Sequence, residues 1–217
     1  MDFLDALFDP NYDFLRYALL MGVLASFAFG ISGSFVVVRR ISFIAGSIAH
    51  AVLGGIGAAL YLERAQGIGW VSPMLGATVS ALMAAGLISW IRFNQAEREE
   101  SVIGAVWAAG MSIGVIFISL TPGYIDPMSY LFGNILFIGN RDLLLVLLLD
   151  GALFLGTILG YRRLEAVCFD EEFARLRGIN TRIYYTLLLC LIALSVVLLV
   201  TVVGIVLVIA LLTIPAS

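Results

Sequence analysis

The chain has 217 residues, of which 62% are hydrophobic and only 12% are charged, and its mean hydropathy is +1.08. A water-soluble domain cannot carry so much apolar side-chain surface, so this composition excludes a soluble fold. The formal net charge of −3 says little, because the placement of charges matters more than their sum in a membrane protein.

All 12 basic residues are arginine, and the sequence contains no lysine. The phosphate-binding loop of Walker-type ATPases needs a lysine that reaches the β- and γ-phosphates, and Schiff-base chemistry needs a lysine amine. We therefore expect this chain to be no enzyme. If ATP drives transport here, a separate polypeptide hydrolyses it.

Apolar stretches long enough to cross a bilayer recur along the chain, since a helix needs roughly 20 such residues to span the ~30 Å hydrocarbon core. These stretches are residues 17–38, 41–62, 71–91, 101–121, 143–161 and 183–203, and a seventh begins at Gly204 and is still apolar at Ser217. The sequence thus predicts an all-α, polytopic transmembrane helix bundle with at least seven membrane helices. Because the seventh stretch has no polar end, we expect residues 1–217 to form a single transmembrane domain that is truncated at its C-terminus.

The placement of arginines predicts the orientation, because short cytoplasmic loops accumulate positive residues. With alternating crossings, nine arginines fall on one side of the membrane and three on the other. The side with nine is then cytoplasmic, and the acidic N-terminus faces the outside.

The connection at residues 162–182 lies on this cytoplasmic side and is too long for a simple turn. Its apolar residues Phe169, Phe173 and Leu176 recur at helical spacing, and Gly178 is typical of a helix end. We expect a short amphipathic helix whose apolar face needs a partner. The residues assigned to this coupling helix are Phe169, Asp170, Glu171, Glu172, Phe173, Arg175, Leu176 and Gly178.

Small residues spaced four apart, such as those around Gly30, Gly46 and Gly54, are expected to pack helices closely. Such contacts associate helices in lipid, where a hydrophobic driving force between helices is absent.

His50 is the only histidine, and it lies about nine residues, or roughly 13 Å, into the second stretch. Asp150 lies about seven residues, or roughly 10 Å, in from the outer end of its stretch. Ionisable groups at such depth are costly and usually mark a substrate path. An imidazole beside a carboxylate would suit a divalent cation or a proton relay, whereas hydrogen bonding between helices is the structural alternative for both residues.

Two functions from other classes remain open at this point. A proton-coupled secondary transporter would use His50 and Asp150 as its relay. An intramembrane serine protease would use Ser32 of the Gly30-Ile-Ser-Gly33 tetrapeptide with His50, but Gly- and Ser-rich tetrapeptides are common at tight helix contacts.

Several segments, read in order, resemble the permease subunits of zinc and manganese ABC transporters. They are residues 33–43 followed by Ala49-His50-Ala51, the external element 126–133, the segment 169–179 and Ile214-Pro215-Ala216. The resemblance implies an importer of divalent metal ions (Zn²⁺, Mn²⁺ or Fe²⁺), with no permanently bound cofactor. It adds Asp126 as a third candidate residue on the metal path.

The same resemblance implies the partners and the location. The permease would form a homodimer in the bacterial plasma (inner) membrane, take its metal ion from an extracytoplasmic binding protein and bind a cytoplasmic ATP-binding subunit. No nucleic-acid partner is expected.

This chain departs from the family pattern at two positions. Family members commonly carry an aspartate four residues before the histidine, where this chain has Gly46, and zinc-type members often have another histidine near Trp107. The sequence does not rank the metals, because one imidazole with uncertain carboxylates suits several divalent ions.

Overall fold

The computed structural model describes residues 13–95, 98–123, 132–133 and 140–213, and within these ranges the chain is almost entirely helical. The helices in chain order are α2 (Asp13–Arg39), α3 (Ser42–Arg64), α4 (Pro73–Asn94), α5 (Glu99–Leu120), α7 (Asn140–Phe169), α8 (Glu171–Leu176) and α9 (Thr181–Thr213). All of them except α8 contain a stretch that is long and apolar enough to cross a membrane, which makes 6 candidate spans in the described residues. The predicted all-α membrane bundle is confirmed.

The apolar stretch that was predicted to start at Gly204 differs from the other spans. Gly204 interrupts α9 with φ 79° and ψ 164°, and the apolar helix around and after this break covers Val203–Leu212. At about 1.5 Å per residue this piece is shorter than the ~30 Å hydrocarbon core. The expected count of at least seven membrane helices therefore depends on this shorter helix, while Ile214-Pro215-Ala216 lies outside the described residues.

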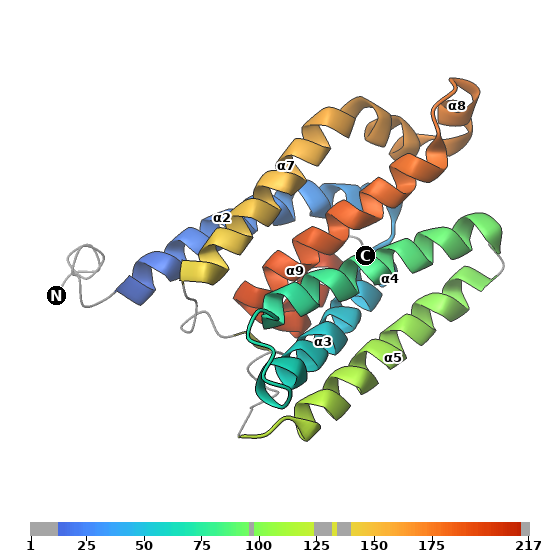
Figure 1. Ribbon diagram of the computed structural model, residues 1–217. Coiled ribbons are helices and arrows are strands. Elements are labelled where there is room, and N and C mark those ends of the chain that lie inside the picture. Colours follow the sequence, from blue (N-terminus) through green and yellow to red (C-terminus); the bar gives the residue numbers. More distant parts are fainter. Residues whose placement is uncertain (1–12, 96–97, 124–131, 134–139, 214–217) are drawn as a thin grey trace.

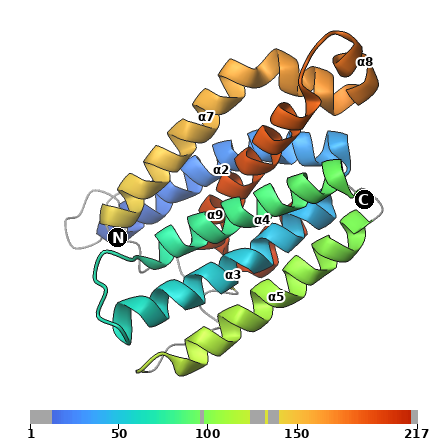
Figure 2. The same cartoon turned by 45° about the vertical axis from the view of Figure 1, so that its right-hand side comes forward.

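Helix α3 lies at the centre of the bundle and packs on α5, α4 and α9. Helix α9 packs in turn on α4, α3, α7 and α2, so that α3 and α9 together form most of the core. Helices α5 and α7 lie at opposite edges of the bundle (Figures 1 and 2). Most side chains of α5 are exposed, because this helix packs on α3 and only slightly on α4.

Glycines allow the backbones of α3 and its neighbours to touch. A Cβ atom at Gly54 would lie 2.9 Å from the carbonyl oxygen of Gly110 in α5. On the α4 side, a Cβ atom at Gly55 would lie 2.2 Å from the carbonyl oxygen of Gly76. Any side chain at these positions would force the helices apart, so the absence of a Cβ determines how α3 packs.

Local sequence explains where the helices begin and end. Ser72 caps α4, since its hydroxyl accepts a hydrogen bond from the backbone N–H of Leu75 at 3.2 Å, and Pro73 occupies the first turn, where its missing N–H costs nothing. Between α2 and α3, Arg40 takes a left-handed φ of 56°, and Ile41 N donates to Val36 O. This hydrogen bond closes α2 and reverses the chain within two residues.

Replacing Gly110 by alanine should destabilise the bundle, because the new methyl group would lie 2.6 Å from Cα of Ala51. Overpacking of this kind costs on the order of 1–3 kcal/mol. Gly86→Ala in α4 is the matched control, since nothing lies within 4 Å of a Cβ atom there, and it should be neutral or slightly stabilising. Thermal unfolding in mild detergent measures the difference. Equal melting temperatures for the two variants would contradict the close contact of α3 with α5.

Candidate functional site

His50, on α3, is buried against α5. Only 8% of its surface is exposed, and its Nδ1 atom has no hydrogen-bond partner among the described residues. The ring of Trp107 in α5 stacks on the imidazole, with the ring centroids 4.4 Å apart and an angle of 30° between the planes. A buried imidazole nitrogen without a partner is unfavourable unless another group binds it, so this atom is the strongest candidate ligand in the described chain.

The residues one turn before His50 face the same neighbour. Gly46 lies against the indole of Trp107, and a Cβ atom there would be 3.1 Å from Cζ3 of the ring. The hydroxyl of Ser47 donates a hydrogen bond to the carbonyl oxygen of Ile103 at 2.9 Å. This face of α3 therefore points at α5 and away from the rest of the bundle.

The other two candidate metal residues are not placed beside His50. Asp150 is partly exposed on α7, which packs on α9, α2 and α8, while α3 packs on the opposite side of α9. Asp126 lies outside the described residues. Among the described residues there is no group of three or more His, Cys, Asp or Glu side chains that could hold a metal ion.

Ser32 and His50, the pair that an intramembrane serine protease would need, lie on two helices that make only slight contact. The hydroxyl of Ser32 is buried and donates a hydrogen bond to the carbonyl oxygen of Ala28, one turn back in its own helix. Its helix α2 packs on α9 and α7 and makes only slight contact with α3, where His50 lies. Gly30, on the same helix, is exposed, and nothing lies within 4 Å of a Cβ atom built there.

The segment predicted as a coupling helix differs slightly from expectation. Phe169 is the last residue of α7, and Asp170 has an extended backbone and caps the short helix α8, accepting a hydrogen bond from Phe173 N at 2.9 Å. After α8, Gly178 takes a φ of 76°, and Ile179 N donates to Ala174 O. The two helices are separate because the cap at Asp170 breaks the helical backbone.

The end of α7 and helix α8 present their larger apolar side chains to the outside. Phe169 is 73% exposed, Phe173 48% and Leu176 87%, whereas the small residue Ala174 is buried against the bundle. The charged residues Glu172 and Arg175 are exposed as well. The guanidinium of Arg177 lies over the ring of Phe173, 4.8 Å from its centroid, and the rest of this apolar surface is exposed at the end of the bundle.

Glu171 connects α8 to the ends of two spans, and through Arg92 to the start of a third. Its carboxylate accepts hydrogen bonds from Arg39 in α2 at 2.6 Å and from Arg92 in α4 at 3.2 Å. Arg92 also donates to both carboxylate oxygens of Glu99, at the start of α5, at 3.2 Å each. The guanidinium of Arg92 lies over the ring of Tyr185 in α9, 4.5 Å from its centroid. We call Arg39, Arg92, Glu99 and Glu171 the charge cluster.

The charge cluster keeps Glu171 ionised. Burial alone would raise the pKa of Glu171, but the hydrogen bonds and positive charges of Arg39 and Arg92 outweigh it, so that the pKa lies below its usual value. The stabilising contribution of Glu171 is therefore present at neutral pH and is lost only as the pH falls through this lowered pKa.

Sequence reasoning missed this cluster, because Arg39 and Arg92 are far from Glu171 in sequence and were interpreted only as markers of the cytoplasmic side. It also interpreted Trp107 only as a departure from the family pattern. The closeness of these residues depends on the packing of helices, for which the linear spacing carries no signal.

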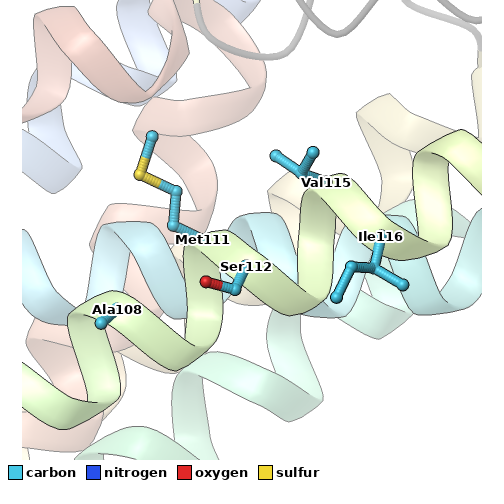
Figure 3. Close-up of a pocket in the computed structure, with 5 residues that line it drawn as sticks. All are labelled: Ala108, Met111, Ser112, Val115 and Ile116. Carbon is cyan, nitrogen blue, oxygen red and sulfur yellow. The ribbon is translucent and has the colours of Figure 1, made fainter.

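The outer face of α5 is apolar and slightly hollowed. Among the described residues, those that line the hollow are Ala108, Met111, Ser112, Val115 and Ile116 of this helix (Figure 3). It lies on the side of α5 that is turned away from α3, because the glycines of the α3 contact occupy the opposite face.

A family model described as the ABC 3 transport family matches residues 11–217. The uncharacterized membrane protein slr2045 of Synechocystis is 39% identical, over 95% of this chain and 72% of the relative. A probable metal transport system membrane protein of Chlamydia trachomatis is 40% identical, over 92% of this chain and 68% of the relative. The manganese import system permease protein ScaB of Streptococcus parasanguinis is 31% identical, over 100% of this chain and 74% of the relative.

Among solved structures, PsaBC from Streptococcus pneumoniae in complex with Fab matches with a TM-score of 0.79 and 29% sequence identity. The match covers 97% of this chain and 73% of that chain. The resemblance inferred from the sequence motifs is thereby confirmed, and the chain is a multi-pass transport permease and no enzyme. It belongs to the ABC 3 transport family.

Proposed function

We propose that this chain is the membrane permease of an ATP-driven importer of divalent metal ions, and that His50 is a ligand on the translocation path. The observation that carries the proposal is the buried, unpartnered Nδ1 atom of His50 in the central helix α3. A neutral imidazole offers a lone pair to a partly dehydrated ion, and weak binding by few protein ligands permits release.

The relatives support metal as the cargo, since one is named a probable metal transport protein and another a manganese import permease. An imidazole binds Zn²⁺ and Fe²⁺ well, whereas Mn²⁺ prefers oxygen ligands. With one histidine in the chain, the remaining ligands come from water, from a second copy of the permease and from Asp126 or Asp150 as subsidiary candidates.

The charges at one end of the bundle support the proposed orientation. Arg39, Arg92, Arg182 and the α8 segment gather at the same end, and an excess of arginine is typical of the cytoplasmic side. The ATP-binding subunit would then contact α8, the N-terminus would face the extracytoplasmic side of the bacterial inner membrane, and the metal-binding protein would deliver its ion there.

We further propose that the permease is a homodimer whose interface includes the outer face of α5. This helix lies at the edge of the bundle and has an apolar, hollowed outer surface. A second copy placed there would bring two His50 residues, each one helix away, to the two sides of the two-fold axis. Two copies together offer more ligands than one chain does.

The role of His50 can be tested by metal uptake into proteoliposomes that contain the full permease–ATPase complex. His50→Ala should reduce uptake of Mn²⁺ or Zn²⁺ by roughly 10–100-fold, as for the loss of a metal-site residue, while folding and assembly remain intact. His50→Gln should not restore uptake, because an amide keeps a hydrogen bond but is a poor substitute for an imidazole ligand. If glutamine restores transport and alanine destabilises the protein, His50 is structural and not a ligand.

The dimer can be tested with Ser112→Cys, at the centre of the α5 hollow, in a background where Cys168 and Cys190 are serine. A short bifunctional maleimide should link two permease chains in native membranes. The control is Ile158→Cys on the exposed face of α7, which should remain uncrosslinked. Crosslinking through Ile158→Cys alone would place the interface on the opposite edge of the bundle.

The coupling surface can be tested with Leu176→Asp. A carboxylate at this exposed apolar position should prevent α8 from entering a groove on the ATP-binding subunit, so that the permease is inserted normally but no longer retains the subunit on purification. Normal copurification and normal ATP hydrolysis in this variant would show that the subunit binds elsewhere.

A second pair of variants separates binding of the ATP-binding subunit from the transmission of its movement to the membrane helices. Glu171→Gln leaves Phe173 and Leu176 in place but weakens the hold on Arg39 and Arg92, so the subunit should still copurify while metal uptake per ATP falls several-fold. Glu172→Gln changes the neighbouring, exposed carboxylate and should behave as the unmodified protein. Equal metal uptake by the two variants would mean that the charge cluster does not transmit the movement of the ATP-binding subunit to the membrane helices.

A further inference from the structure

We propose that Trp107 is the gate of the metal path, a side chain that blocks the path until it moves. In this structure the indole covers one face of the imidazole of His50, and a displacement of α5 would uncover that face. The proposal rests on the proposed role of His50 as a metal ligand. It concerns a residue that offers no ligand atom itself, since the indole N–H is only a donor.

The first argument is the fit of the indole. Trp107 stacks on His50 at a centroid distance of 4.4 Å and also lies against Gly46, one turn earlier in α3. A side chain at position 46 would meet Cζ3 of the indole at 3.1 Å from its Cβ atom, so the ring fills the space left by glycine. One flat ring thus covers a full turn of α3, including one face of the histidine ring, and an ion that approaches the imidazole from the α5 side meets the indole first.

The second argument is that α5 is held almost entirely by one neighbour. It packs on α3 and only slightly on α4. Its contact with α3 runs along smooth glycine pairs, Gly54 with Gly110 and Gly57 with Gly114, and the hydrogen bond from Ser47 to Ile103 O is the side-chain bond between the two helices in the described residues. A helix that is held mainly by one neighbour can move as a unit, and displacement of one packed helix is a common conformational change.

The third argument connects α5 to the coupling segment. Glu99, in the first turn of α5, is paired with Arg92, which also binds Glu171 of α8. Trp107 lies about two turns, or roughly 12 Å, further along the same helix. A movement of α8 that pulls on Glu171 is therefore passed through Arg92 to the end of the helix that carries Trp107.

Together, these three features describe how the gate would open and close. With α5 in place, the apolar ring keeps water and ions away from the centre of the membrane, as hydrophobic constrictions do in channels. When α5 moves, the imidazole becomes a free ligand. Binding of ATP on one side of the membrane would thus control access to a site near its middle.

His50 is the only histidine in the chain, so its chemical modification reports directly on the gate. Diethyl pyrocarbonate attacks neutral imidazole nitrogen that it can reach. The complete permease–ATPase complex, purified through a tag without histidine and placed in lipid nanodiscs, is treated without metal, and mass spectrometry quantifies the modified peptide. In the unmodified complex without nucleotide, His50 should react slowly.

Trp107→Ala should increase the rate of modification by roughly tenfold or more, as for a group that goes from a protected to an open state. Trp107→Leu, which keeps apolar volume but loses the flat ring, should give an intermediate rate and serves if the alanine variant fails to assemble. Trp90→Ala, at an exposed position of α4, is the control and should react as slowly as the unmodified complex. An unchanged rate of His50 modification in both Trp107 variants would overturn the proposal that Trp107 is the gate.

The unmodified complex supplies a measurement that needs no substitution. During ATP hydrolysis without metal, His50 should be modified faster than in the nucleotide-free complex, and equal rates in the two states would overturn the movement of α5. Addition of Mn²⁺ or Zn²⁺ to the Trp107→Ala complex then tests the underlying function separately. Protection of His50 by either ion supports it as a ligand. If His50 is uncovered in this variant but neither ion protects it from modification, His50 is not a metal ligand. The proposed ion path behind Trp107 would then be refuted as well.

Discussion

Backbone contact at glycine is the constraint on which the rest of this structure depends. In lipid, helices gain little from burying apolar side chains against each other, so close packing has to come from shape. Gly54, Gly55 and Gly57 place α3 against both α4 and α5, and side chains at these positions would overlap the neighbouring backbones. The central position of α3, and with it the burial of His50, follows from this contact.

The same contact that buries His50 also brings Trp107 onto it. Because α5 touches α3 through backbone atoms, the indole reaches across the short gap and lies flat over a full turn that starts at Gly46. A bulkier interface would keep the ring away. The departure from the family pattern at position 46 and the tryptophan at position 107 are thus one structural feature, in which the absence of a side chain on one helix accommodates a large one on the next.

At the α8 end of the bundle, the charge cluster fixes how the helices lie against one another. Its three ion pairs are only partly exposed and share two of their members, so the charges hold one another in place more firmly than isolated surface pairs do. Through Glu171 the short helix α8, which is too small to be stable alone, is attached to α2 and α4. Its apolar side chains remain outside, available to a partner.

The sequence by itself determined the membrane-spanning elements and the short helix α8. Runs of apolar residues of sufficient length must form helices in a bilayer, because their backbone groups find no other partners there. Asp170 and Gly178 delimit α8 through local hydrogen bonds, and these depend only on neighbouring residues. The family resemblance rested on such local segments, and the comparisons with known proteins confirm it.

Only the tertiary structure decided which polar groups meet. Asp150 and His50 were predicted at similar depths, yet depth does not state on which side of α9 each helix lies, and the structure separates them. Glu171 meets Arg39 and Arg92, which are 132 and 79 residues away in sequence, because the spans return to the same end of the bundle. Trp107 covers His50 because two helices approach at glycine. Contacts of this kind depend on the mutual rotation and position of helices, which an apolar sequence in lipid specifies weakly until the whole bundle has packed.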